Sequence, residues 1–434
     1  MNTKVLKNKN FLLLMLGKAV SMLGSNMQQF ALSLYVLAVT GSATIFASMM
    51  SISILPRLIL SPVAGVFGDW FDRKKSIVAL DFISGLLICA YALYYSISGE
   101  LSLVSIYVLV ILLEVTEVFF SSAMAAAVPS IVEKDELFQA NSVKSVITSF
   151  CSIAAPILAS LLCGLVGLHI ILVICGISFI LSALSELTIE IPATHKKPKK
   201  INIAAFKTDL VEGIKIIKAH KMIMNIIGIG MIINFCLSPL FSVGLIFIIR
   251  EILKGSELQY GLFSTILALA MVISPITLGH IAQKIKVGKL FVYVFALTAA
   301  LIGLLASASS NLFIGLFTTN TVPFIVITFI SFLIGMIVTL VNITVGTLFG
   351  TVVPKEFMGR TGAVLNLGLT VAMPLGQMIS GIGLDLLPAS YIVASAAGIM
   401  FLAIFIYRKP LLEADNSTQE KVKDDIINEN PISN

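Results

Sequence analysis

The stretch SPVAGVFGDWFDRKKS (residues 61–76) decides how this chain must fold. It begins as an apolar run through Gly65, and five charged residues then arrive within seven positions. They are Asp69, Asp72, Arg73, Lys74 and Lys75, and the single tryptophan, Trp70, lies among them. An apolar run that ends abruptly in a basic cluster is typical of a helix that leaves a membrane on its cytoplasmic side. We therefore predict a membrane-spanning helix before Asp69 and a basic loop after it.

The composition of the whole chain supports this interpretation. Of its 434 residues, 58% are apolar and 12% are charged, and the mean hydropathy is +1.02. A soluble domain is about 45–50% apolar and about 25% charged, so the additional apolar surface must face lipid. The apolar runs are long and continuous rather than alternating, which favours helices over barrel strands. The five cysteines are scattered through these runs without disulfide or metal spacing, so we predict no metal site.

Apolar windows bounded by charged or turn residues predict twelve spans. They cover about residues 10–38, 43–67, 76–98, 102–128, 141–166, 168–189, 222–250, 257–282, 288–308, 319–350, 360–385 and 388–408. The longest polar stretch, 190–221, lies between spans six and seven and ends in apolar residues at helical spacing, which predicts an amphipathic helix on the membrane surface. We therefore predict an all-α polytopic membrane protein with six-helix bundles at 1–189 and 222–408 and a disordered tail at 409–434.

The distribution of lysine and arginine predicts the orientation of the chain. If the N-terminus is cytoplasmic, 24 of the 29 basic residues fall in cytoplasmic segments, whereas the outer loops hold only Arg250 and Lys254. Cytoplasmic loops carry the excess of Lys and Arg in membrane proteins. We expect both termini to be cytoplasmic and the protein to lie in a bacterial inner or plasma membrane.

The two halves of the chain resemble each other. The opening stretch at 61–76 has a counterpart, SPITLGHIAQKIKVGK, at 274–289, and SIVEKDELFQANSV (130–143) parallels TVVPKEFMGRTGAV (351–364). Each of the latter precedes a span with small residues beside a proline, namely Ala155 and Pro156 in one half and Pro374 and Gly376 in the other. Small residues allow close helix packing. Two pseudo-symmetric bundles with a site at their interface are typical of secondary transporters.

This pattern resembles the major facilitator superfamily over nearly the whole chain. Four stretches are similar, more narrowly, to the drug:proton antiporter branch that includes macrolide-efflux proteins and the enterobactin exporter. They are SMLGSNMQQFALSLYVLAVTGSA (21–43), LPRLILSPVAGVFGDWFDRKKSIVALD (55–81), VPSIVEKDELFQANSV (128–143) and DLVEGIKIIKAH (209–220). The resemblance implies twelve transmembrane helices in the major facilitator fold, and export of small molecules by alternating access.

The resemblance also implies a conformational latch in the opening stretch. In this interpretation Gly65 permits close helix approach, Asp69 pairs with Arg73 at the cytoplasmic rim, and Asp81 is a neighbour of Arg73. Trp70 and Asp72 depart from the family pattern. The counterpart at 274–289 has Gln283 in place of the aspartate, so only the first loop can supply the charged partner. The alternative is that these charges only stop transfer and orient the chain.

Four charged residues fall at one depth inside the predicted spans. Lys18, Arg57, Glu114 and Glu117 all lie roughly 18–22 Å from the outer surface, counted at 1.5 Å per helical residue. Glu114 and Glu117 share a helix face, and like charges at this spacing favour binding of a proton by one of them. We predict that one of them, preferably Glu114, exchanges the coupling proton. The alternative is a permanent salt bridge with Arg57.

Polar residues at helical spacing mark spans one, four, seven and ten, which line the central cavity in the resembled family. The predicted cavity residues are Ser25, Gln28, Ser121, Asn234, Ser238, Thr328, Ser331, Thr339 and Asn342. The C-terminal half contributes almost no charge to these spans, which suits a large and mostly apolar substrate. Ordinary small-residue packing between helices is the alternative for each stripe.

These observations predict a proton-coupled exporter of amphipathic or hydrophobic small molecules, including drugs or macrolides. We expect a proton gradient as the energy source, membrane lipids as surroundings, a monomeric state, and neither a cofactor nor a nucleic-acid partner. No Ser/His/Asp set, metal cluster or phosphate loop is recognisable in the sequence, so we do not predict an enzyme. The alternatives are an exporter specific for a siderophore or lipid-like metabolite, and a non-transporting membrane sensor.

Overall fold

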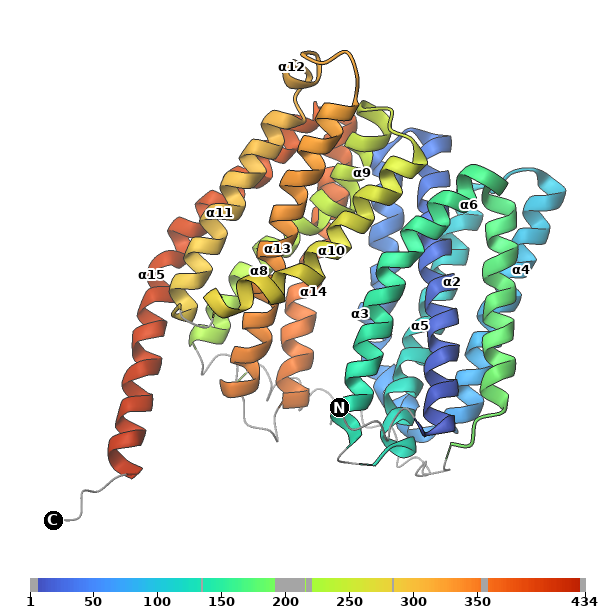
Figure 1. The fold of residues 1–434 in the computed structure, drawn as a ribbon, viewed down its shortest axis with the longest axis horizontal. Helices are drawn as coiled ribbons and strands as arrows, with labels where there is room; N and C mark the ends of the chain where they lie inside the picture. Colours follow the sequence, from blue (N-terminus) through green and yellow to red (C-terminus); the bar gives the residue numbers. More distant parts are fainter. Residues whose placement is uncertain are drawn as a thin grey trace. The chain divides into compact units, whose positions relative to one another are not determined.

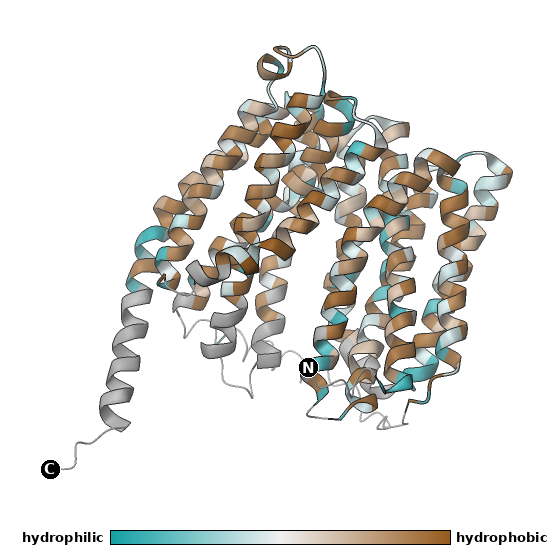
Figure 2. Ribbon diagram, viewed as in Figure 1, coloured by the Kyte–Doolittle hydropathy of each residue, from teal (hydrophilic) through white to brown (hydrophobic). Residues whose placement is uncertain are grey.

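The computed structural model describes residues 7–133, 136–191, 215, 221–282, 285–352 and 358–429. Within these ranges every regular element is a helix (Figure 1). Apolar residues cover most helices on their outer as well as their inner faces (Figure 2). Large apolar side chains such as Leu93, Leu165 and Phe405 are exposed, as expected for helices surrounded by lipid.

The first five helices follow one another with short connections. They are α2 (Lys9–Thr40), α3 (Ala43–Trp70), α4 (Arg73–Ser98), α5 (Leu103–Ile131) and α6 (Leu137–Leu187). The remaining elements are α8 (Lys221–Pro239), η2 (Leu240–Gly244), α9 (Leu245–Phe247), η3 (Ile248–Ile252), α10 (Glu257–Ala282), α11 (Val287–Ala308), α12 (Asn311–Ile314), α13 (Thr321–Val352), α14 (Met358–Leu386) and α15 (Ala389–Glu429).

Ten helices in the described residues are long and apolar enough to cross a membrane by length and composition. One of them, α6, is two helices joined at Gly167, where φ is 76° and ψ is 173°. This left-handed backbone suits a residue without a Cβ atom, and it separates predicted spans five and six. With both parts of α6 and the 32-residue helix α2 included, the described residues contain the twelve predicted spans.

The chain divides into two compact units. The first unit contains Met1–Asn202 and Ile249–Ala268, and the second contains Ile203–Ile248 and Leu269–Asn434. The predicted division at 190–221 differs from this in one segment, because the start of α10 packs with the first unit. There the ring of Tyr260 stacks on Phe30 of α2, with ring centroids 4.6 Å apart. The predicted amphipathic helix at 190–221 lies outside the described residues, apart from Lys215 and the ends of the stretch.

The prediction of a disordered tail at 409–434 is wrong for most of its length, because α15 continues to Glu429. Its last part follows Pro410 and includes three glutamates, two lysines and two leucines, which are good helix formers. Lys409 Nζ and Glu413 Oε1 are 3.9 Å apart across one turn, a spacing that supports an exposed helix. Residues 430–434 lie outside the described part.

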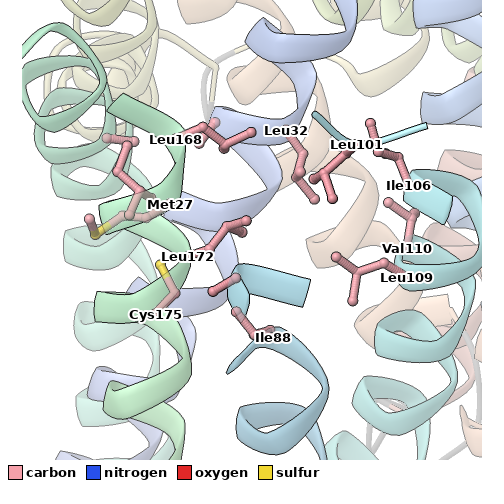
Figure 3. Packing of buried hydrophobic residues seen from close by; sticks show 14 of the residues in the cluster. Met27, Leu32, Ile88, Leu101, Ile106, Leu109, Val110, Leu168, Leu172 and Cys175 are labelled. Atoms are coloured by element: carbon pink, nitrogen blue, oxygen red, sulfur yellow. The ribbon is translucent and has the colours of Figure 1, made fainter. Parts of the chain in front are cut away.

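Two apolar clusters form the core of the first unit. The first cluster joins α2, α4, α5 and α6 and includes Met27, Ile88, Leu109 and Leu172 (Figure 3). The second cluster uses other segments of the same helices and includes Phe11, Leu14, Met15, Ile77, Phe120, Met124 and Ile189. Along each of these helices, a segment separates the residues of one cluster from those of the other.

The second unit is held by α8, α11, α13, α14 and α15, with α11 packed on α13 and α15 and with α8 packed on α14 and α15. The span predicted at 222–250 is interrupted after Pro239 by two π-helical turns, η2 and η3. Proline removes a backbone donor from the helix, and π-helical turns commonly accommodate the resulting break in the hydrogen-bond pattern.

All five cysteines of the chain are free thiols, and three of them are buried.

Candidate functional site

Polar side chains of the first unit gather between its two apolar clusters. Each of α2, α4, α5 and α6 contributes to this region, which we name the polar layer. Its members are Lys18, Ser21, Ser25, Gln28, Asp81, Ser84, Glu114, Thr116, Glu117, Ser182 and Glu186. Buried polar groups need partners, so the contacts inside this layer determine its chemistry.

Arg57 of α3 reaches the edge of the polar layer and pairs with Glu114. Its Nη2 atom is 3.4 Å from Glu114 Oε2, and the two side chains are 60% and 18% exposed. The structure therefore contains the salt bridge that the sequence left open as an alternative. Because a guanidinium stabilises the charged form of an adjacent carboxyl, this contact favours an ionised Glu114.

Glu117 lies one turn further along α5 and borders two cavities. The larger cavity has a volume of about 370 Å³ and is lined by Arg57, Ser61, Glu117, Ser121 and Ser122, together with apolar side chains. This volume lies in the range of small-molecule pockets. No basic group in the described residues lies within ion-pair distance of Glu117, although Lys18 is within electrostatic range.

The smaller cavity is also lined by Glu117. Its volume is about 10 Å³, room for about one water molecule. Polar side chains from α2, α4 and α5 line it, namely Ser25, Gln28, Asp81, Ser84, Thr116 and Glu117, beside three apolar residues. The hydroxyls of Ser84 and Thr116 are hydrogen-bonded at 2.9 Å and link α4 to α5. The predicted residues Ser25 and Gln28 thus line an internal cavity of the first unit, and Ser121 lines the larger one.

The structure describes only part of the predicted latch. The backbone of α3 continues through Gly65 and Asp69 to Trp70, but the side chains of Asp69 and Trp70 lie outside the described part. Asp72, which the sequence left unexplained, is the N-cap of α4: its Oδ1 accepts a hydrogen bond from the Lys75 backbone N–H at 3.1 Å. An N-cap satisfies a backbone donor that the helix cannot satisfy itself.

Asp81 lies deep in the polar layer, about two turns beyond Arg73. It is 2% exposed, and its carboxylate accepts a short hydrogen bond from the hydroxyl of Ser21 on α2. A second hydroxyl, that of Ser182 on α6, lies close enough to interact with it. These contacts tie α4 to α2 and α6, whereas the latch interpretation placed Asp81 beside Arg73.

The predicted cavity residues of the second unit differ in exposure. Thr328 and Ser331 of α13 are buried, and their hydroxyls have no hydrogen-bond partner within the described part of the chain. Thr339, on the same helix, is half-buried and donates to Gly335 O at 2.8 Å, while Asn342 is exposed. Asn234 and Ser238 of α8 are half-buried. The stripe on α13 therefore runs from a closed interior to an open surface.

The small residues predicted to pack helices lie at close approaches. Ala155 is fully buried, and a Cβ atom added to Gly261 of α10 would lie 3.4 Å from the carbonyl oxygen of Pro156. Pro374 and Gly376 are buried in α14. A Cβ atom at Gly376 would collide with the Phe235 carbonyl and would lie 2.8 Å from Pro239 Cγ on α8.

Sequence reasoning missed Glu186 and Gly17. Glu186 is 1% exposed near the end of α6, and a Cβ atom at Gly17 would lie only 3.1 Å from its Oε1. Glu186 lies in the apolar sequence ILSALSELTI, where an acidic residue is costly and therefore informative. Its position near a span end made it look like an ordinary boundary residue.

A helical membrane protein with a buried ionisable layer beside a substrate-sized cavity belongs to the class of membrane transporters. The family model of the Major Facilitator Superfamily matches residues 14–361 and 229–432. The chain therefore belongs to the Major Facilitator Superfamily, a family of transporters and not of enzymes, as predicted.

Relatives of this chain are distant in sequence, but the similarity extends over most of its length. Macrolide efflux protein A of Streptococcus pyogenes is 21% identical over 375 residues, which are 85% of this chain and 88% of that protein. Enterobactin exporter EntS of Salmonella typhimurium is 22% identical over 357 residues, 79% and 78% of the two chains. The predicted resemblance to these proteins is confirmed at this level.

Solved structures support the fold. Nucleoside transporter NupG matches with a TM-score of 0.70 at 12% identity and covers 93% of this chain and 99% of its own. A bacterial homologue of the iron transporter ferroportin matches with a TM-score of 0.64 at 17% identity, covering 94% and 98%. At these identities the likeness shows the fold alone, that of a multi-pass membrane transporter.

Proposed function

We propose that this protein is a proton-coupled exporter of amphipathic or hydrophobic small molecules in a bacterial cell membrane, with both termini cytoplasmic. The distant likeness to an efflux protein and to an exporter supports outward transport. The excess of Lys and Arg in the connections assigned to the cytoplasm supports the orientation. Transport would proceed by alternating exposure of a site to the two sides of the membrane.

The main support for proton coupling is the position of Glu117. It borders the larger cavity, where a substrate could lie, and also the small cavity inside the polar layer. Unlike Glu114, which Arg57 holds in an ion pair, Glu117 has no basic group within ion-pair distance among the described residues. A carboxyl that can change charge at a modest cost is what a proton carrier needs. We therefore assign the coupling proton to Glu117 and not, as the sequence favoured, to Glu114.

The other members of the predicted site have supporting roles in this proposal. Arg57 and Lys18 stabilise the ionised form of Glu117 after the proton leaves, because both are within electrostatic range of its carboxylate. Competition between the substrate and the proton for the larger cavity would couple their movements. Gly65, Asp69 and Arg73 remain proposed as the cytoplasmic latch.

A specific siderophore exporter is the second candidate. It is favoured by the likeness to the enterobactin exporter and by the partly exposed guanidinium of Arg57, which could meet an anionic group in the larger cavity. A panel that includes an anionic chelator and a neutral lipophilic dye would separate the two candidates by which compound is transported.

Everted membrane vesicles test the proposal directly. With an inward-acidic proton gradient, vesicles containing the protein should accumulate a lipophilic dye, and an uncoupler should abolish the accumulation. The variant Glu117→Gln should lose gradient-driven accumulation, whereas Glu100→Gln, at an exposed carboxyl between α4 and α5, should retain it. Dye leaving the vesicles, or accumulation that Glu117→Gln does not reduce, would contradict the proposal.

A further inference from the structure

Two carboxyl groups of the polar layer have no part in the function proposed above. Asp81 of α4 is 2% exposed and Glu186 of α6 is 1% exposed. Their side chains interact electrostatically, and the hydroxyl of Ser182 interacts with both: it donates to Glu186 Oε1 at 3.5 Å and lies close to Asp81. Asp81 and Glu186 therefore form one buried acidic pair.

No positive charge neutralises this pair within the described part of the chain. The partners of the two carboxyls are the hydroxyls of Ser21 and Ser182, which are neutral. Glu186 Oε2 is buried and accepts no hydrogen bond from any described residue. Burying one carboxylate without a partner is expensive, and two adjacent carboxylates are more so, because their repulsion is weakly screened inside a protein.

The charged groups on the neighbouring helices do not change this conclusion. Lys18 of α2 lies near Glu117 and Lys144, and Glu114 of α5 is paired with Arg57. Glu117 itself adds a further negative charge within range of Asp81. Arg73 begins α4 about two turns before Asp81. The pair therefore needs a cation of its own, and the smallest that fits two close carboxyls is a proton.

The residue on α2 that faces this pair has no side chain and so leaves space for it. Gly17 of α2 faces it: a Cβ atom there would lie 3.1 Å from both Glu186 Oε1 and Ser182 Oγ. Any larger residue would push the carboxyl of Glu186 away. Asp81 also lines the small cavity that Glu117 borders, and the room there for about one water gives a proton a short path between them.

We propose that Asp81 and Glu186 hold one proton between them, and that their remaining negative charge accepts the proton that Glu117 releases. In this step the O–H bond of Glu117 breaks as an O–H bond forms on the pair, through water in the small cavity. Glu117 becomes a carboxylate, and the pair becomes neutral. The shared proton stands independently of transport, whereas its exchange with Glu117 rests on the proposed proton coupling.

Infrared spectroscopy of the purified protein in lipid vesicles tests the shared proton. A protonated carboxyl gives a C=O band that shifts in heavy water, and measurement in a Glu117→Gln background removes any contribution from Glu117. We expect this band at neutral pH, altered in Asp81→Asn and in Glu186→Gln and lost when both are combined. Glu100→Gln should leave it unchanged. A band that persists in the combined variant, or no such band in the parent, would overturn the shared proton.

Two further measurements apply where a carboxyl variant folds poorly. Ser182→Ala keeps both carboxyls but removes the hydroxyl that interacts with both, so it should shift the frequency of the band. Loss of the band on adding sodium or potassium would instead show that a metal cation occupies the site, and it would overturn the proposal that Asp81 and Glu186 share a proton.

The exchange step has its own test. After a rapid drop in pH, the part of the band that the combined Asp81→Asn and Glu186→Gln substitutions remove should grow at least tenfold faster in the otherwise unaltered protein than in the Glu117→Gln variant. Equal rates would overturn the exchange with Glu117 while leaving the shared proton intact. Absence of any transport in vesicles would contradict the proposed function without affecting the infrared result.

Discussion

The two units place polar groups in their interiors in different ways. In the first unit, the buried polar side chains include Asp81 and Glu186, with Lys18, Glu114 and Glu117 partly buried beside them. In the second unit, the buried polar residues of the described chain are all neutral: Ser274, Thr298, Ser309, Thr328, Ser331 and Gln377. Gln377, for example, donates from its amide to Ser242 Oγ at 3.1 Å.

The two halves, though similar in sequence pattern, therefore differ in the charge that they bury. Charged groups inside a membrane are costly and are usually retained for ion or proton movement. Neutral hydroxyls and amides cost less, and they fix helix positions and can contact a substrate without changing charge. Proton handling is therefore expected in the first unit, and conformational support with neutral substrate contacts in the second.

A carboxylate in the interior of the second unit should be poorly tolerated. Ser331→Asp would place a charge at a position of 0% exposure whose hydroxyl has no partner among the described residues. An uncompensated buried charge costs about 3–5 kcal/mol, so yield and thermal stability in detergent should fall sharply.

Ser331→Ala is the matched control. It removes an unsatisfied hydroxyl and should leave stability unchanged or raise it by about 1 kcal/mol. If the aspartate variant unfolds at the same temperature as the parent, the interior of the second unit accepts charge and the comparison between the units fails.

Close helix packing in the second unit should depend on Gly376. Gly376→Ala would force a methyl group against the backbone carbonyl of Phe235 and the ring of Pro239. Overpacking of this kind costs about 1–3 kcal/mol, which thermal unfolding would detect as a lower midpoint. Gly303→Ala on α11 has no atom within 4 Å of the added methyl and should be neutral or slightly stabilising. Equal midpoints for the two variants would show that α8 and α14 separate at little cost.

The loops that begin α4 and α11 are counterparts in sequence but not in capping. Asp72 caps α4 through its side chain, whereas Lys286, before α11, makes no side-chain cap. Asp72→Ala should therefore lower stability by about 1 kcal/mol, and Asp72→Asn, an equally good cap, should retain it. Chemical or thermal unfolding of the two variants decides the point. Similar losses in both would mean that the charge of Asp72 matters and its hydrogen bond does not.

The smallest effect is expected for the Arg57–Glu114 ion pair. With Arg57 60% exposed, a double-mutant cycle of Arg57→Met and Glu114→Gln should give a coupling energy of only about 0.2–1 kcal/mol in stability. Transport should respond more than stability, because the cycle removes charges beside Glu117. A coupling energy of several kcal/mol would instead identify the pair as a structural element of the first unit.

Several parts of the site followed from the sequence, and others did not, for identifiable reasons. The depth of Arg57, Glu114 and Glu117 could be counted from helix rise alone, and the structure brings them together. Which glutamate is paired depends on how α3 packs against α5, and spacing along one helix does not contain that information. Glu186 escaped notice because its burial is created by α2 and α4, and in particular by the space that Gly17 leaves.

The sequence by itself determined that this chain is a helical membrane protein with two related halves and with charge concentrated in the first. Those features follow from hydropathy, from the period of the helix, and from the cost of placing charge in lipid. The three-dimensional structure added that Asp72 caps α4, that α15 continues to Glu429, and that Asp81 and Glu186 lie close together in the polar layer. The cap is a local contact, whereas Asp81 and Glu186 are far apart in the chain, so their distance is set only by the packing of α4 against α6.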